Sequence, residues 1–283
     1  DGNLDGQLLP GLDPLGVPKS LVNSAIPFYY NDFKSFNNVI ETNRDTIGAI
    51  ILEPVRAKGP EKGFLEHIRK VADDIGAVLI FDEVTSGFHN NLGGIHLTYN
   101  IIPDIAIFAK ALGNGFPIGA IVGKRDVMDI AQSTFISSTS WTERVGFAAA
   151  IATINKMESE PVHESLNRYG SLLKKGWEQI AEANGVKIEI SGITTIPNFR
   201  FCYENSLAIQ TYFTQEMMSA GYLAKTGTAV TYAYTGEIIN GYMEQVDKVF
   251  KKIKKGLSNK NIEKMLKSEI KHSTFKRLTG VQE

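Results

Sequence analysis

The chain has 283 residues, a formal net charge of −1, and 43% hydrophobic residues. This length allows one large and one smaller domain, and the balanced charge gives no reason to expect nucleic acid or a membrane surface as a partner. No apolar run reaches the length of a membrane span, and the single cysteine, Cys202, excludes an internal disulfide and predicts a reducing cytosol. Cys202 lies in an apolar run, so we expect it to be a small core residue.

The first part of the chain is predicted to be loop, because Gly, Pro, Asp and Asn dominate residues 1–16. The chain begins at Asp1 rather than Met, in the middle of this loop, which suggests an incomplete sequence. A helix is predicted over residues 32–44, with Asp32 as its N-cap.

Three short apolar runs each end in a polar side chain. Residues 47–52 lead into Glu53, residues 77–81 into Asp82, and residues 105–109 into Lys110. Runs of this length suit strands of a sheet that is covered on both faces. An amphipathic helix ending at Ile75 separates the first two runs, which predicts a parallel pair with a right-handed crossover. Ligands bind at the carboxyl ends of such strands, so the three polar residues should converge on one crevice.

An acid and an amine at neighbouring strand ends have two explanations of about equal weight. The first is a salt bridge that closes the top of the sheet. The second is a Schiff-base lysine, Lys110, with Asp82 facing a pyridine nitrogen, as in pyridoxal phosphate enzymes.

The motifs FDEV and FAKALGNGFPIGAIVG resemble the class III (subgroup II) aminotransferases, and most of all the glutamate-1-semialdehyde aminomutase group. The resemblance covers about residues 16–253 and is strongest between Glu53 and Ile154. It implies an α/β protein of fold type I with a mostly parallel central sheet and a small α+β C-terminal domain. It divides the chain into a PLP-binding part (1–156), the small domain (157–256) and a Lys-rich tail (257–283), which we expect to be solvated helix or disorder.

The same resemblance assigns roles around pyridoxal 5′-phosphate. Lys110 forms the Schiff base, Asp82 bonds the pyridine nitrogen, and Val84 packs against the flat face of the ring. Val84 points to the same side as Asp82 if the strand continues, and an ordinary core position is its other explanation. Thr85 stands where many transaminases have a glutamine that reaches the phenolic oxygen, a departure shared by aminomutase-like members. Glu53 lies on the substrate side, or simply caps backbone groups at a strand end.

The resemblance also implies an obligate homodimer with shared active sites. Thr139, with Ser138 as the alternative, takes the place of a threonine that binds the phosphate of the neighbouring subunit's cofactor. Its other explanation is a loop hydroxyl that caps the next helix. Relatives carry a Ser-Gly-x-Glu-Ala phosphate cradle and a ring-stacking aromatic residue in a segment before Asp1, and neither is found in this sequence.

Competing sites find little support. The glycines after Lys110 lack the spacing of a P-loop or of a dinucleotide-binding motif. His89 and His96 have no acidic or cysteine partners at metal-ligand spacing, so no metal site is predicted. In the small domain, Arg200 is the only arginine between residues 169 and 276, and a carboxylate clamp from this domain looks absent.

The remaining predicted elements are helices over 126–132, 161–183, 206–220 and 236–253, two strands around Ser191-Gly192, and a strand over 229–234. The predicted function is amino transfer between a small amino donor and an oxo acceptor through Lys110. The alternatives are an aminomutase, which returns the amino group to the same molecule, a non-catalytic fragment that keeps the fold, and a nucleotide-binding α/β module.

Overall fold

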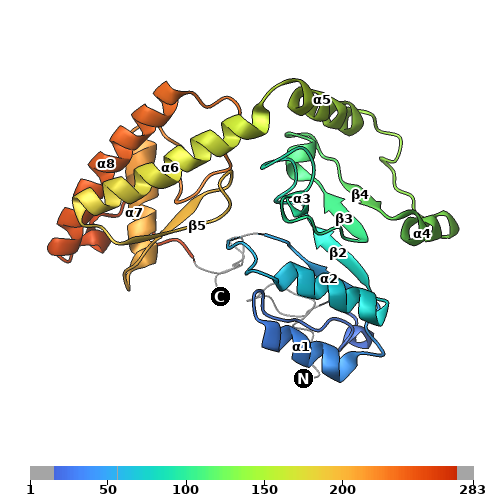
Figure 1. Cartoon of the computed structure of the whole chain (residues 1–283). Coiled ribbons are helices and arrows are strands. Elements are labelled where there is room, and N and C mark those ends of the chain that lie inside the picture. The colour runs from blue at the N-terminus through green and yellow to red at the C-terminus, as the bar shows by residue number, and fades with distance from the viewer. Residues whose placement is uncertain (1–15, 56, 273–283) are drawn as a thin grey trace.

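The computed structural model describes residues 16–55 and 57–272 and shows two lobes (Figure 1). The elements of the first lobe are α1 (Phe33–Asn43), β1 (Ala49–Leu52), α2 (Phe64–Ile75), β2 (Val78–Asp82), α3 (His96–Tyr99), β3 (Ile105–Phe108), β4 (Ala120–Gly123), α4 (Arg125–Met128) and α5 (Val145–Ser159). Those of the second lobe are α6 (Val162–Asn184), β5 (Ile188–Ser191), β6 (Asn198–Phe201), α7 (Ser206–Ser219) and α8 (Gly236–Ser258). Short 3-10 turns occupy Lys19–Leu21, Lys110–Leu112, Asp129–Ser133 and Ile262–Met265.

The first lobe is built on one four-stranded sheet in the order β1-β2-β3-β4. The first three strands are parallel, and β4 runs antiparallel to β3. Helix α2 connects β1 to β2, which confirms the predicted crossover between parallel strands. The carboxyl ends of β1, β2 and β3 therefore lie along the same edge of the sheet.

Local signals explain where the helices of this lobe begin and end. The Asp32 side chain accepts a hydrogen bond from Ser35 N at 2.9 Å, which confirms the predicted N-cap of α1. Helix α2 lies between Gly63 and Gly76, both in the left-handed region, where glycine has no Cβ penalty.

One face of the sheet is covered and the other is open in the described part of the chain. Helices α1 and α2 pack over β1 and β2 through a core that includes Phe36, Phe64 and Phe81. On the opposite face, Ile51 is 57% exposed and Ile121 is 60% exposed. The prediction of strands covered on both faces therefore holds for one face only, because no described helix packs over the second.

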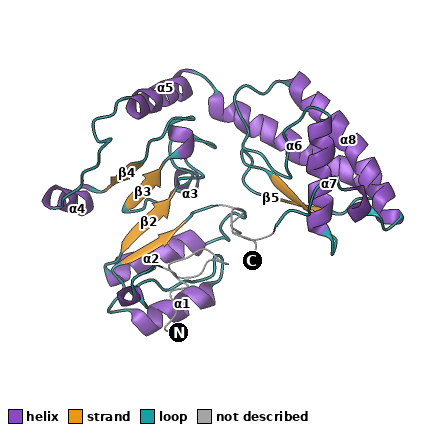
Figure 2. Ribbon diagram, turned by 180° about the vertical axis from the view of Figure 1, so that it is seen from behind, coloured by secondary structure: helices purple, strands orange, loops and turns teal. Residues whose placement is uncertain are grey.

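Helices α6, α7 and α8 lie together in the second lobe (Figure 2). They enclose a core of its own that is rich in aromatic residues. Trp177 is fully buried and packs at a tilt against Phe199, which also contacts Phe213 and Phe250. Strands β5 and β6 form an antiparallel pair beside these helices. The predicted α+β arrangement of this lobe agrees with these elements.

The prediction of a strand over residues 229–234 is wrong, because this segment is a loop. Its β-branched and aromatic composition is typical of strands, but its backbone meets residues 195–198 along an irregular path. An isolated bridge, Asn198–Gly227, precedes the segment, and within it Val230 N donates a hydrogen bond to Thr195 O at 2.9 Å. No ladder results, so the segment stays a loop.

Cys202 is exposed rather than buried, which corrects the prediction of a core position. Alternation along β6 turns Phe199 and Phe201 inward, so Arg200 and Cys202 point outward.

Up to residue 272, the tail is neither a solvated helix nor disordered, which corrects the prediction for this part of it. After the 3-10 turn at Ile262–Met265, it follows α7 through hydrogen bonds from Lys267 N to Gln215 Oε1 and from Lys271 N to Thr211 Oγ1. Residues 273–283 lie outside the described part of the chain.

Among the described helices, none combines the length and the apolar character that crossing a bilayer requires.

Candidate functional site

Lys110 lies in the turn that directly follows β3, at the carboxyl end of the parallel strands. Its backbone has a φ of 44°, a left-handed conformation that is uncommon for a side chain of this size. Its Nζ donates a hydrogen bond to Thr85 Oγ1 at 2.9 Å. Backbone strain of this kind is concentrated at functional sites, and here it directs an exposed primary amine toward the loop that follows β2.

Asp82 is the last residue of β2, the strand beside that of Lys110. Its Oδ1 accepts a hydrogen bond from Val84 N at 3.0 Å. Val84 was expected to point to the same side as Asp82 if the strand continued. Strand β2 ends at Asp82, so that condition is not met. No ion pair joins Asp82 to Lys110 among the described residues, so the salt bridge considered above does not form.

A salt-bridge cluster exists instead at the opposite end of β3. Asp104 accepts bonds from Arg69 at 2.8 Å, from Lys124 at 2.7 Å and from Leu79 N at 2.7 Å. Burial acts to raise the pKa of Asp104, but these three donors hold that pKa below its ordinary value. The charges that stabilise this sheet thus lie away from the end that carries Lys110.

Glu83, which was not predicted from the sequence, directly follows β2 and is fully buried. Its carboxylate accepts hydrogen bonds from Ile95 N, from His96 N and Nδ1, and from the Ser86 hydroxyl. Burial acts to raise the pKa of Glu83, yet the bonds from His96 and Ser86 keep it below the ordinary value. Glu83 therefore anchors the loop that presents Thr85. The signal that could have revealed it was a second acid directly after a buried strand.

A cavity of about 770 Å³, which we call the interlobe cavity, opens beside Lys110. Thr85, His89 and Lys110 line it from the first lobe, Lys156 from α5, and Val230 and Tyr232 from the second lobe. The volume lies in the range of small-molecule binding sites. Lys156 pairs with Glu160 at 2.7 Å, and its Nζ lies 5.3 Å from the centre of the Tyr232 ring, which brings the two lobes together at this point.

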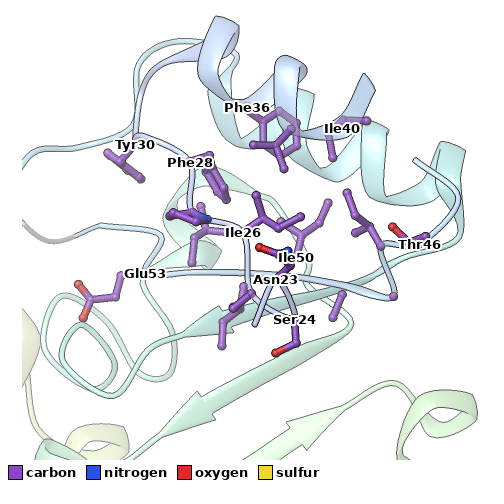
Figure 3. A pocket seen from close by; sticks show the side chains of 18 of the residues that line it. Asn23, Ser24, Ile26, Phe28, Tyr30, Phe36, Ile40, Thr46, Ile50 and Glu53 are labelled. Atoms are coloured by element: carbon purple, nitrogen blue, oxygen red, sulfur yellow. The ribbon is translucent and has the colours of Figure 1, made fainter. Parts of the chain in front are cut away.

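The other predicted site residues lie apart from this cavity. Ser138 and Thr139 are exposed in the loop between α4 and α5, and the structure does not bring them to Lys110. Glu53 follows β1 at the end of a separate hollow of about 1120 Å³ between the 23–30 segment, α1 and β1. Its carboxylate is turned away from the apolar side chains there (Figure 3).

His96 is buried and bonded to Glu83, and His89 lines the interlobe cavity. Within residues 16–55 and 57–272, no cluster of three or more potential metal ligands is present.

Comparison with known proteins adds the family. A model of the aminotransferase class-III family matches residues 23–257. The chain belongs to the class III aminotransferases. It is 31% identical over 253 residues to 3-aminobutyryl-CoA aminotransferase of Cloacimonas acidaminovorans, covering 83% of this chain and 61% of that protein. It is 37% identical over 188 residues to glutamate-1-semialdehyde 2,1-aminomutase of Syntrophobacter fumaroxidans, covering 64% of this chain and 43% of that protein. The chain thus spans about half of the length of these class III relatives.

Solved structures give the same fold. The FumI protein of Sphingopyxis sp. MTA144 matches with a TM-score of 0.76 at 24% identity, covering 82% of this chain and 58% of that one. An omega-transaminase from Sphaerobacter thermophilus matches with a TM-score of 0.76 at 20% identity, covering 88% and 63%. The class III chain therefore has the fold type I architecture that its motifs predicted.

Proposed function

We propose that this class III chain carries the lysine-bearing part of a pyridoxal 5′-phosphate-dependent aminotransferase, with Lys110 as the residue that binds the cofactor covalently. The supporting observation is the Lys110 amine, which is held by Thr85 at the carboxyl edge of the sheet and beside the interlobe cavity. The amino donor and the oxo acceptor are small molecules that use this cavity in turn.

The residues present suit this cofactor. An exposed primary amine in a left-handed turn can reach an aldehyde, and the carboxylate of Asp82 ends the neighbouring strand. When bound, the cofactor supplies an aldehyde that condenses with amines and a pyridine ring that accepts electron density from a substrate carbon. In this proposal Asp82 keeps the ring nitrogen protonated and Thr85 lies beside the ring. The role of Val84 against the ring face is supported by the resemblance alone, because β2 ends at Asp82. Glu53, on the substrate side, has the weakest support, because it follows β1 and lines another hollow.

Lys110 has two roles in this proposal. Its Nζ would hold the cofactor covalently. As a free amine, Lys110 would act as a general base that takes a proton from the substrate carbon onto Nζ, and the resulting ammonium would return that proton as a general acid. The hydroxyl of Thr85 orients Nζ for this transfer, because it already accepts a hydrogen bond from that atom.

Aminomutase activity is the second candidate, supported by Thr85 at the position where many transaminases carry glutamine. The two activities differ in one reactant. An aminotransferase consumes an external oxo acceptor, whereas an aminomutase converts a single substrate without one. Omitting the acceptor from an assay therefore separates them.

We further propose that two copies of the chain share their sites. The segment around Thr139 exposes large apolar side chains, with Phe135 97%, Phe147 58% and Trp141 59% exposed. A surface of this kind marks an interaction site. A second copy that covers it would receive the hydroxyl of Thr139 or Ser138 at its cofactor phosphate.

The exposed thiol of Cys202 suits a reducing cytosol, where we place the protein.

The deciding experiment is covalent trapping. The chain is incubated with pyridoxal phosphate and reduced with borohydride, and the modified peptide is identified by mass spectrometry. We expect the label at residue 110, its loss in Lys110→Ala, and its retention in Lys248→Ala, a variant of an exposed lysine on α8. Labelling that is spread over exposed lysines and unchanged in Lys110→Ala would contradict the proposal and favour a non-catalytic role for the fold.

A further inference from the structure

His89 lines the interlobe cavity in the same loop as Thr85. Its ring is half-buried, and its Nδ1 is buried without a hydrogen-bond partner. By contrast, His96, the first residue of α3, donates its Nδ1 hydrogen to Glu83 at 2.8 Å. In the first lobe, His67 also has a ring-nitrogen partner, with Nε2 2.7 Å from Asn37 Oδ1. His89 therefore differs from these two in having a ring without a partner at the wall of a cavity.

The unpartnered Nδ1 indicates where the ring proton lies. A buried N–H without an acceptor is rarer and costlier than a buried acceptor without a donor. The favoured tautomer of His89 therefore carries its proton on Nε2 and leaves the lone pair on Nδ1. Nε2 is not among the buried unpartnered atoms, and no described residue bonds it. It is thus an accessible donor on a side chain that lines the cavity.

The surroundings of His89 keep this donor neutral. Burial lowers the pKa of His89 below its ordinary value, and the positive charge of Lys110 lowers it further. The imidazole is then uncharged at neutral pH, with one N–H to donate. A neutral donor beside an amine suits an oxygen acceptor of a ligand, because such an atom is attracted by both groups.

The cationic side chains that could bind a ligand oxygen here already have partners among the described residues. In the second lobe, Arg200 lies on the outward side of β6 and pairs with Glu189, so it does not reach the cavity as a clamp. Within the described part of the chain, the lysines that line the cavity include Lys110, which has its own role, and Lys156, which pairs with Glu160.

We propose that His89 orients the substrate by donating its Nε2 hydrogen to a carbonyl or carboxylate oxygen that lies a few atoms from the substrate amino group. This inference rests on the proposed function and names the substrate class for the same site: amino compounds that carry an oxygen acceptor, held by the His89 donor rather than by an arginine. His89 is a positioning residue in this scheme, and Lys110 performs the proton transfer.

Two measurements test the role of His89. The first is a long-range ¹H–¹⁵N correlation spectrum of the imidazole rings at pH 7. The chain has five histidines, and the signal that disappears in His89→Gln is that of His89. We expect the neutral Nε2–H tautomer. The second is calorimetric binding of glutarate and of glutaramide, which have two oxygen acceptors and no amino group. Both are measured with and without pyridoxal phosphate.

The variants separate the donor from the shape of the ring. His89→Leu should weaken binding of the preferred probe about tenfold, the effect of one lost hydrogen bond, while His89→Gln, which keeps an N–H, should stay within about threefold. His163→Leu is the matched control, since His163 on α6 also has a buried Nδ1 without a partner. Tighter binding of glutarate would identify a carboxylate as the acceptor, and equal binding of the two probes a neutral carbonyl.

Three results would overturn the assignment: an Nδ1–H tautomer or an imidazolium at pH 7, unchanged affinity in His89→Leu, or failure of the unmodified chain to bind either probe. The result of the Lys110 trapping experiment is independent of these measurements, because neither the His89 tautomer nor the affinity for the probes requires the cofactor. The proposed function can therefore fail while the His89 assignment stands, and the reverse.

Discussion

Glu83 and His96 form a buried pair in which His96 Nδ1 donates to Glu83 Oε1 at 2.8 Å. The pair lies beneath the loop that holds Thr85 against Lys110, so a structural contact supports the reactive amine. Because the acid is fully buried and accepts four hydrogen bonds, its loss should affect the whole lobe.

Glu83→Gln should lower the free energy of unfolding by about 3 kcal/mol at pH 7, because an amide cannot accept all of these bonds and brings its own donors. The pKa of Glu83 is held below its ordinary value in the folded protein, so its stabilising effect is full above about pH 4.5 and is lost as the pH falls through the folded pKa. The difference from the unmodified chain in urea denaturation should therefore shrink in acid. Glu66→Gln on the exposed side of α2 is the control, and equal losses in both variants would contradict this account.

Gly170→Ala should destabilise the second lobe, although alanine is normally the better helix former. A Cβ at position 170 would clash with the backbone oxygen of Thr194, and a main-chain atom cannot move aside as a flexible side chain would. We expect a loss of about 2 kcal/mol in thermal or urea unfolding. Gly236→Ala, where nothing lies within 4 Å of the new Cβ, should be neutral or slightly stabilising. A stabilised Gly170→Ala variant would show that α6 packs differently.

Thr85→Val should weaken covalent attachment at Lys110, because Nζ loses the hydroxyl that holds it. The pyridoxal phosphate concentration that gives half-maximal borohydride trapping should rise about tenfold, as expected for one hydrogen bond to a charged group. Thr85→Ser keeps the hydroxyl and should stay within about threefold. If valine and serine behave alike, Thr85 does not orient the amine.

The exposed apolar segment should control association. Phe135→Glu combined with Phe147→Glu places two charges on the proposed interface and should convert a dimer into a monomer, as measured by light scattering. Leu223→Glu changes a residue that is 94% exposed on the second lobe and should leave the dimer intact. An unmodified chain that is monomeric at tens of micromolar would refute the shared-site proposal, and the cofactor trapping at Lys110 would still be interpretable.

Local patterns predicted much of this chain. The apolar runs before Asp82 and Lys110 are adjacent parallel strands, and Asp32 caps α1, because strand and helix periods and capping are properties of neighbouring residues. The prediction of a strand over 229–234 was wrong because a strand needs a hydrogen-bonded partner from elsewhere in the chain. The composition of the segment does not show whether such a partner is present.

The sequence by itself determined the family, the order of most elements, and the position of a lysine and an acid at adjacent strand ends. Only the tertiary structure showed that Glu83 is the buried anchor, that Lys110 has a left-handed backbone and bonds Thr85, and that His89 presents an unpartnered ring to a cavity between the lobes. The physical reason is that periodicity and motif spacing describe a segment and its neighbours. Burial, tautomer and hydrogen-bond partners depend on side chains that are brought together from distant parts of the chain.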